Sequence, residues 1–435
     1  MATLWYRKPL VGWTQISGLS VSMSGRGVTK KDVNFYDYDG TLVAGYTIAE
    51  ARALTALPSA PDHSGDTIPK TFQSWNYTLS QVNATTTPLD VGGIYVTTDG
   101  KTWFHIRVTA VSGGSIPFYF SKSSASDTLE INYGDGQSDS DGTNSTVTFT
   151  PSTALSAGDH YVSAWISNGS GTITLGQGTA NTTCVGGSTP AHRNTLIEVF
   201  CGDDVSALAQ SAFHDCHSLF LITLSSGITS CGTGAFQLCY SLLYLLLPSG
   251  ITSIPEAMCN YCYSLLLVSA PYSITSIGYG ALRYCTALDS FVVPNGVTSI
   301  GTAAFEYDYS LASLSLSNSI TAIPSAMCDS CYALSSVTIP SSVTTIDSYA
   351  FQYCYSLTEI TYPAGIGSID ASAFNNNYSI IKHDFSTCIA VPTLVSASAF
   401  TGINTICLMD IPTSLYGAWS AASNWSTYVN YMEAI

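Results

Sequence analysis

Hydrophobic residues in the second half of the chain recur with a fixed 23-residue period. One column of leucine and isoleucine runs from Leu219 to Ile380, and a column of isoleucine and valine runs from Ile228 to Ile366. Each period holds a short apolar stretch bounded by Gly, Pro and Ser, which predicts one short strand followed by a turn. A unit of this size cannot bury its apolar face alone, so the units must stack into a solenoid.

Each unit reads A-F-x-x-C-x-x-L-x-x-I-x-L-P-x-x-(I/V)-x-x-I over roughly Thr195 to Ala390. This repeat sequence resembles the BspA-type leucine-rich repeat of bacterial proteins. The resemblance implies a leucine-rich-repeat solenoid with a binding or adhesive role. Because stacked strands lie ~4.8 Å apart, residues that share a column in the sequence should become neighbours in space.

Cysteines occupy another column of the repeat, and Asp308 and Asn377 fill its two gaps in register. We expect buried thiols that pack as small hydrophobic side chains. The C-x-x-C pairs at 259–262 and 328–331 are three repeats apart, ~14 Å at the strand spacing, which is too far to share one zinc ion. Disulfides between neighbours of the column stay open, although stacked side chains rarely have the required dihedral angle. The expected structural ladder is Cys216, Cys239, Cys262, Cys285, Cys331 and Cys354.

A tyrosine column beside the cysteines is the first candidate interaction surface. Stacked rings could shield the coil beneath them, or they could offer a broad contact area to a partner. Both interpretations stay open. The column consists of Tyr240, Tyr263, Tyr309, Tyr332, Tyr355 and Tyr378, with His217 and Thr286 completing it.

An apolar patch confined to the first three repeats is the second candidate interaction surface. Later repeats place Asp, Ser, Ala, Thr and Glu at the same positions. A patch at one end of a solenoid usually marks a covered surface, so we expect docking of the preceding domain or a subunit contact rather than ligand binding. The patch consists of Phe220, Leu221, Leu243, Tyr244, Leu246, Leu266 and Leu267.

Alternating strands with turn-rich spacing from His105 to about Gly178 predict an Ig-like β-sandwich. The segments INYGDGQ and AGDHYVSAWISN resemble polycystic-kidney-disease-type Ig-like modules, with Tyr133 at the position where a tryptophan is usual. The spacing of Asp135, Asp139 and Asp141 allows a calcium site, but no glutamate follows at the twelfth loop position. We therefore expect a solvated hairpin and no metal site here, with calcium as the alternative.

Two short strings resemble the haloacid-dehalogenase phosphatases. FYDYDGTL matches the nucleophile loop, which implies Asp37 as nucleophile and Asp39 as acid/base, and LIEVFCGDD matches the later acidic metal motif. Counting back one repeat from Leu224 gives Cys201, so we expect GDD to be the turn of the first repeat.

The stretch after Asp39 predicts only one short helix, Ile48 to Thr55, and no βαβ alternation. We therefore expect D-G to be a hairpin turn whose strands pack through Val33, Phe35, Leu42 and Val43, and no enzyme.

Composition limits the partners. Only 10% of the 435 residues are charged and the net charge is −16, which argues against a nucleic-acid-binding surface. No run of 18 apolar residues predicts a membrane span. The first residues, MATLWYRKPLVGW, lack the apolar core of a secretory signal.

The expected architecture is mainly β with four parts. A β-rich N-terminal anchoring module takes residues 1–104, an Ig-like sandwich 105–186, the solenoid 187–390 and a C-terminal cap 391–435. In the cap, Leu415, Trp419, Ala422 and Trp425 have helix-like spacing, which predicts a helix that covers the open end of the core. The N-terminal wording also resembles modules of virion or prophage surface proteins from gut bacteria.

We therefore expect a non-enzymatic phage virion protein of the fibre, tail or head-decoration type that presents its solenoid for binding. A secreted BspA-like adhesin or a self-assembling filament subunit is the alternative, and a phosphatase using Asp37 and Asp39 is a further one. Expected partners are other assembly proteins, a host-surface protein or glycan, and copies of the chain itself, with no cofactor. The expected location is a virion or the extracellular space.

Overall fold

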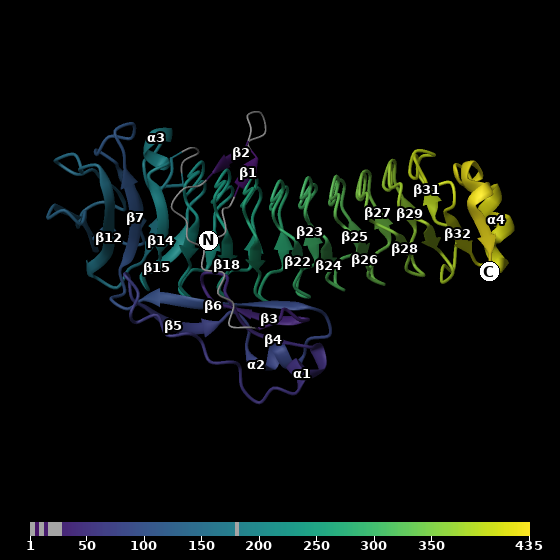
Figure 1. Cartoon of the computed structure of the whole chain (residues 1–435), viewed down its shortest axis with the longest axis horizontal. Coiled ribbons are helices and arrows are strands. Elements are labelled where there is room, and N and C mark those ends of the chain that lie inside the picture. Colours follow the sequence, from purple (N-terminus) through teal and green to yellow (C-terminus); the bar gives the residue numbers. More distant parts are fainter. Residues whose placement is uncertain (1–4, 8–12, 16–27, 179–181) are drawn as a thin grey trace.

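The computed structural model describes residues 5–7, 13–15, 28–178 and 182–435. The N-terminal stretch on which the expectation about a secretory signal rests lies largely outside these residues. An elongated solenoid forms the body of the molecule, a sandwich lies at one end, a helical cap lies at the other, and a small module lies against one side (Figure 1). The first strands are β1 (Trp5–Arg7) and β2 (Trp13–Gln15), an antiparallel pair.

The module is a four-stranded sheet of order β4-β3-β6-β5 with two short helices. The expected hairpin is confirmed, because β3 and β4 pair antiparallel, while β3 and β6 are parallel. Each helix begins with a capping box, Thr47 with Glu50 and Thr78 with Gln81, which satisfies the first free amides. The elements are β3 (Val33–Tyr36), β4 (Leu42–Tyr46), α1 (Ile48–Arg52), β5 (Lys70–Trp75), α2 (Leu79–Asn83) and β6 (Leu89–Thr97).

The expectation of a single helix in this region is wrong, because α2 is present as well. Five residues are too few to show a helical period in the sequence, and the capping box was its only signal.

Two sheets form the sandwich, and both continue into the solenoid. One sheet has the order β10-β9-β12-β7-β14-β16-β18-β20, and the other has the order β11-β8-β13-β15-β17. One hydrophobic core therefore extends from the sandwich through the coils to the cap. The sandwich strands are β7 (Thr102–Val108), β8 (Phe118–Lys122), β9 (Thr128–Asn132), β10 (Ser138–Asp141), β11 (Thr146–Phe149), β12 (Gly158–Asn168) and β13 (Ile173–Leu175), and α3 (Pro190–Arg193) leads into the first coil.

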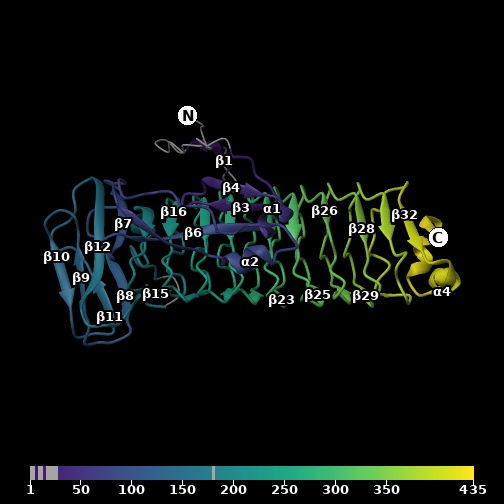
Figure 2. The same cartoon turned by 90° about the horizontal axis from the view of Figure 1, so that it is seen from below.

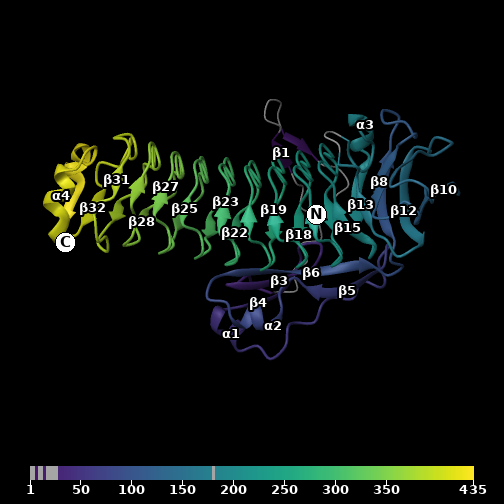
Figure 3. The same ribbon diagram turned by 180° about the vertical axis from the view of Figure 1, so that it is seen from behind.

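Each coil contributes one strand to each of two faces, and the strands pair in parallel with a register shift of one repeat (Figure 1, Figure 3). The first face contains β14 (Leu196–Phe200), β16 (Leu221–Thr223), β18 (Tyr244–Leu246), β20 (Leu267–Ser269), β22 (Ser290–Val292), β24 (Ser313–Ser315), β26 (Ser336–Val337), β28 (Glu359–Thr361) and β30 (Lys382–Asp384). The second face contains β15 (Val205–Leu208), β17 (Ser230–Cys231), β19 (Ser253–Ile254), β21 (Ser276–Ile277), β23 (Ser299–Ile300), β25 (Ala322–Ile323), β27 (Thr345–Ile346), β29 (Ser368–Ile369) and β31 (Thr393–Leu394).

The expectation of one strand per coil is therefore wrong. Most strands of the second face hold only two residues, which is too short for a recognisable alternation. The parallel ladder also continues beyond residue 390, because β29 pairs with β31.

The cysteine column lies inside the coils, as expected. Cys239, Cys262 and Cys285 are fully buried, and each Sγ–H donates to a backbone carbonyl 26 residues earlier at 3.0–3.3 Å. Cys331 and Cys354 repeat this bond. In the gap at 377, Asn377 Nδ2 donates to the carbonyl of Phe351 with the same 26-residue offset. The thiols thus act as small hydrophobic side chains that also satisfy buried carbonyls.

Burial raises the pKa of the Cys239, Cys259 and Cys285 thiols far above the ordinary range, so none of these three provides a reactive thiolate near neutral pH. We expect 5,5′-dithiobis(2-nitrobenzoic acid) to leave the column cysteines of the native protein unmodified, and to titrate all 13 cysteines after denaturation. Rapid native reaction of Cys239 or Cys262, mapped by mass spectrometry, would contradict the buried column.

The C-terminal cap closes the solenoid with aromatic side chains. Trp419 and Trp425 are fully buried and pack on Phe385 at ring-centroid distances of 5.1 and 5.5 Å. The expected helix is split, since Ala422 is extended with ψ 148° and Asn424 is left-handed with φ 66°. The cap contains β32 (Leu408–Ile411), the 3-10 turn Thr413–Leu415, α4 (Tyr416–Ala421), the 3-10 segment Trp425–Tyr431 and β33 (Met432–Ala434). In the described part of the chain, no helix is long and apolar enough to cross a membrane.

Candidate interaction surface

The N-terminal module covers the apolar patch of the first repeats. Strand β6 runs along the long axis and crosses successive coils (Figure 2). Leu246 and Leu267 pack with Tyr36 and Ile94 of the module, and Leu42 and Tyr244 flank this contact. A second contact joins Ile68 to Phe200 and Leu221, with Phe220 beside it. Leu243 is buried and Leu266 is half-buried, but neither belongs to these two clusters.

Directed hydrogen bonds fix the position of the module. Asn76 Nδ2 donates to the Leu247 carbonyl at 3.1 Å and to Ser269 Oγ at 2.9 Å. Ser269 Oγ donates to the Asp90 carbonyl at 2.7 Å, and Tyr77 donates its hydroxyl to the Ala270 carbonyl at 2.8 Å. Most of the patch therefore lies in an intramolecular interface with the module.

The position of Gly40 explains why glycine follows Asp39 in the phosphatase-like segment FYDYDGTL. Its φ is +78°, and a Cβ at this position would lie 2.2 Å from Cε1 of Tyr244 on the solenoid. Only glycine allows both the left-handed turn and this close approach. The string thus encodes a hairpin tip that docks on the coils.

Asp37, the nucleophile that the resemblance implies, is 3% exposed and fully engaged. Oδ1 accepts from the amide of Tyr38 at 2.8 Å, and Oδ2 lies 2.9 Å from Nε2 of His63. The other nitrogen of His63 faces Asp66, which also binds Lys70 at 3.0 Å. Burial raises the pKa of Asp37, and His63 opposes this effect. The Asp37 carboxyl thereby joins β3 to the loop that carries His63 and Asp66.

Asp39 and the GDD segment are turn residues. Asp39 Oδ1 accepts from the amide of Thr41 at 2.9 Å. Asp203 and Asp204 lie in the turn between β14 and β15, as the repeat register predicts. Asp204 Oδ2 accepts from the amide of Ile166 at 2.8 Å, and burial raises the pKa of Asp204 to about 6.

The three aspartates of the candidate calcium loop do not converge. Asp135 accepts from the amide of Gln137, Asp139 from that of Ser140, and Asp141 from that of Thr143. The ammonium group of Lys122 lies 3.3 Å from Asp141. No group of three or more His, Cys, Asp or Glu that could hold a metal ion occurs within the described ranges. This arrangement gives the calcium alternative no support, because Asp135 and Asp141 accept from amides of their own turns and Asp139 accepts from the next amide of β10.

The tyrosine column forms stacked rows on the solenoid surface. Rings of Tyr309 and Tyr332 lie 4.8 Å apart and those of Tyr332 and Tyr355 lie 5.0 Å apart, with interplanar angles of 15° and 20°. Tyr240 stacks on His217 at 4.2 Å and on Tyr263 at 5.1 Å. Thr286 interrupts the row between Tyr263 and Tyr309, where its hydroxyl donates to the Tyr263 carbonyl.

A second column of tyrosines bridges this interruption. Tyr261, Tyr284 and Tyr307 stack at 4.5 Å steps, and edge contacts join Tyr261 to Tyr263 and Tyr307 to Tyr309. The result is one continuous series of ring contacts, which we call the tyrosine ribbon. It consists of His217, Tyr240, Tyr263, Tyr261, Tyr284, Tyr307, Tyr309, Tyr332, Tyr355 and Tyr378.

The sequence also shows tyrosines directly before several column cysteines, at Tyr261, Tyr284 and Tyr353, but their role as a bridge between the two parts of the first column was not predicted. The signal was the equal spacing, one repeat each, from Tyr261 to Tyr284 to Tyr307.

The backbone beneath the ribbon is rigid and locally strained. Tyr261, Tyr284, Tyr307 and Tyr353 have φ between 56° and 65°, a region that costs an ordinary side chain ~1–2 kcal/mol. Their amides donate to carbonyls of the following coil, for example Tyr284 to Glu306 at 3.0 Å. These inter-coil bonds hold the left-handed conformation, so the rings project from a fixed frame.

The ribbon is half-exposed and largely uncharged. Tyr309, Tyr332 and Tyr355 are each 39% exposed, and Tyr378 is 56% exposed. Partial burial and the neighbouring Tyr240 and Tyr261 raise the pKa of Tyr263 to about 12. The phenol of Tyr263 therefore stays neutral at physiological pH and can donate or accept hydrogen bonds.

The match to a family model agrees with the 23-residue coils of the solenoid. Residues 191–312 and 278–407 match the BspA-type leucine-rich repeat region. No curated protein sequence matches the chain. Three similar solved structures are a leucine-rich repeat protein from Bacteroides ovatus, a leucine-rich cell surface protein from Faecalibacterium prausnitzii and a leucine-rich repeat protein from T. pallidum.

The alignments with these structures are partial. Sequence identities are 25%, 22% and 23%, and TM-scores are 0.44, 0.21 and 0.31, in the same order. The alignments cover 48%, 46% and 42% of this chain, and 53%, 77% and 83% of the other chains. The chain thus spans about half the length of the Bacteroides ovatus protein. With its 23-residue coils and the family match over residues 191–407, the chain is a BspA-type leucine-rich repeat protein.

Proposed function

We propose that the protein is a non-enzymatic adhesion protein that acts outside a cell and binds a protein partner through the tyrosine ribbon. The observation that supports this function most is the continuous, half-exposed series of ring contacts on a rigid backbone. Tyrosine provides a wide apolar area and a polar tip at low entropic cost, and such residues dominate protein interfaces. A solenoid repeats this surface over an extended length.

The backbone beneath the ribbon fixes the positions of its rings. The left-handed conformation of Tyr261, Tyr284 and Tyr307 recurs at Leu238, Ser330 and Asn376 in the same repeat position, so it belongs to the coil geometry. Glycine or asparagine would fit these positions with less cost. Ring stacking offsets part of that cost, by ~0.5–1.5 kcal/mol per pair.

The BspA-type family match favours a secreted bacterial adhesin over a phage virion component. The virion interpretation rests on the resemblance of the N-terminal sequence to modules of virion or prophage surface proteins, and it stays a prediction. Fractionation of a native source separates the two. A secreted adhesin should occur on washed cells or in supernatant without lysis, whereas a virion component should copurify with particles.

Replacing Tyr309, Tyr332 and Tyr355 together by serine should weaken cell binding at least tenfold, because truncation of even one hot-spot tyrosine in an interface costs ~2 kcal/mol. The measurement is flow cytometry of labelled full-length protein on intact bacterial and epithelial cells. A matched control replaces Tyr279 and Tyr349, which are 48% and 44% exposed but lie outside the ribbon. Equal cell binding by the ribbon variant and the control variant would show that the tyrosine ribbon is not part of the binding surface.

A further inference from the structure

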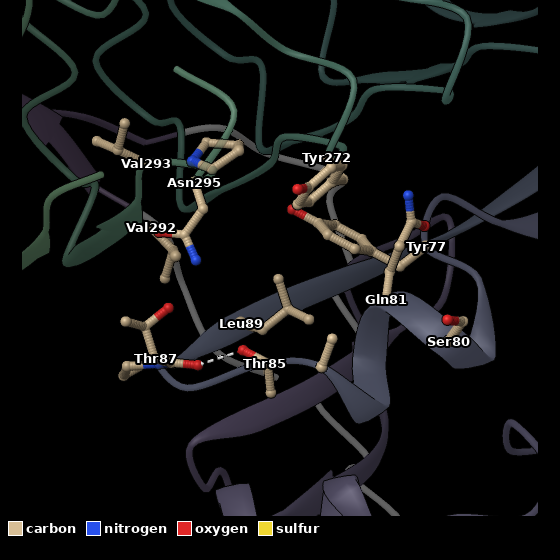
Figure 4. Close-up of a pocket in the computed structure, with 13 residues that line it drawn as sticks. Tyr77, Ser80, Gln81, Thr85, Thr87, Leu89, Tyr272, Val292, Val293 and Asn295 are labelled. Carbon is tan, nitrogen blue, oxygen red and sulfur yellow. Dashed lines mark hydrogen bonds between the residues drawn. The ribbon is translucent and has the colours of Figure 1, made fainter. Parts of the chain in front are cut away.

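A cavity of about 270 Å³ lies at the seam between the module and the solenoid (Figure 4). The module contributes α2 and the following loop, and the solenoid contributes the turns after β20 and β22. This cavity is separate from the tyrosine ribbon and from the buried interface of Leu246 and Leu267. Its volume is close to the ~300 Å³ lower limit of small-molecule sites.

The solenoid wall consists of successive rungs of one turn column. Tyr272 and Asn295 are one repeat apart, so they lie one strand spacing apart, ~4.8 Å. Tyr272 is 48% exposed and turns its ring toward the cavity opposite Leu89 (Figure 4). The position before Tyr272 in this column is Ser249, so the aromatic ring appears where the column reaches the cavity.

Polar groups converge on the cavity from both parts of the chain. Gln81 Oε1 is held by Thr78, which donates its amide at 2.7 Å and its hydroxyl at 3.0 Å, so Gln81 Nε2 remains as a donor. The carboxamide of Asn295 has no hydrogen-bond partner among the described residues, although it lines the cavity. Ser80 at the rim adds a hydroxyl. A ligand would therefore meet amide donors and acceptors together with one hydroxyl.

Among the described residues, no charged side chain lines the cavity; the other lining residues are alanine, threonine, valine, proline, leucine and tyrosine. A charged ligand would be desolvated there without a counter-charge, which is unfavourable. An aromatic ring and aliphatic side chains suit the C–H face of a sugar ring, and the carboxamides suit its hydroxyl groups. We propose that this cavity binds one unit of a neutral saccharide.

This proposal goes beyond the tyrosine ribbon and does not depend on it. The test uses saturation-transfer NMR with full-length protein and five separate probes, namely glucose, galactose, mannose, N-acetylglucosamine and the anionic N-acetylneuraminic acid. We expect at least one neutral sugar to bind and N-acetylneuraminic acid to bind more weakly. Asn295→Ala should weaken binding about tenfold, the effect of losing ~1.4 kcal/mol of hydrogen bonding.

Asn318→Ala is the matched control, because Asn318 occupies the same position one coil later and lies outside the cavity. A second variant, Gln81→Glu, keeps the oxygen that accepts from Thr78 and replaces only the free donor. Both amide variants should leave the melting temperature unchanged while reducing saturation transfer. Absence of transfer to every neutral sugar, equal loss in Asn295→Ala and Asn318→Ala, or preference for N-acetylneuraminic acid would each overturn the proposal.

Discussion

Leu267→Asp is expected to release the N-terminal module while the solenoid stays folded. Leu267 is 6% exposed and points out of its coil onto Ile94 and Tyr36, so the substitution leaves the interior columns intact. Losing a buried leucine and burying a carboxylate there should cost the docked state roughly 3–5 kcal/mol. Hydrogen exchange should increase in β5 and β6, and limited proteolysis should cut within residues 47–104.

Ser313→Asp is the matched control for this variant. Ser313 holds the same position two coils later, where the side chain is exposed and no module covers it. The control should keep wild-type exchange and protease resistance. Wild-type protection in Leu267→Asp would show that the apolar patch does not hold the module, and a loss of the coil melting transition would show that Leu267 belongs to the coil core.

Asp308→Asn is expected to stabilise the protein at neutral pH. Asp308 fills a gap in the cysteine column, is fully buried, and accepts through Oδ1 from the amide of Cys285 at 2.7 Å. Its Oδ2 has no hydrogen-bond partner among the described residues. Asparagine at this position can donate as Asn377 does, and satisfying a buried polar atom contributes ~1–3 kcal/mol.

The pH dependence of this effect has a fixed sign. Burial raises the pKa of Asp308 well above its ordinary value, and the nearby Cys331 adds to the shift. Above the unfolded pKa of ~3.9, the unfolded state loses the proton while the folded state keeps it. The contribution of Asp308 to the free energy of unfolding is therefore fully present below pH ~4 and falls by ~1.4 kcal/mol per pH unit until the folded pKa is reached.

Denaturant unfolding of wild type and Asp308→Asn between pH 4 and 8 measures this difference. The advantage of the variant should grow with pH, while a control variant, Glu359→Gln at an exposed position, should show no such growth. A constant difference across the range would mean that Asp308 is already ionised in the folded state.

The repeat register predicted the solenoid because the same interior positions of every coil require small or apolar side chains that fit the shared core. The columns of Leu, Ile and Cys can be identified from the 23-residue spacing alone. The same register assigns the GDD segment to the turn of the first repeat without any coordinates. The apolar patch could also be read, because Leu221, Tyr244 and Leu267 give way to Ser290 and Ser313 in the same column. Which segment covers the patch could not be read, since the partner strand β6 is separated from it by more than a hundred residues.

The two-residue strands and α2 lay beyond sequence reasoning. Elements of two to five residues form because neighbouring coils or caps fix them, and their own sequences carry no period. The cavity at the seam depends on docking geometry, so Tyr272 and Asn295 gave no signal as a site. Asp37 gave a false signal of a catalytic site. The sequence around this buried carboxylate, which joins two loops, matches the motif of a phosphatase nucleophile.

The continuity of the sandwich sheets with the coils has a consequence for synthesis. The sandwich leaves the ribosome before the repeats, and its β7 offers an edge on which β14 can pair. Each later coil then needs only its own repeat to complete a rung on an existing template. Nascent chains thus grow by addition to an ordered end, and unpaired apolar rungs are limited to the newest coil.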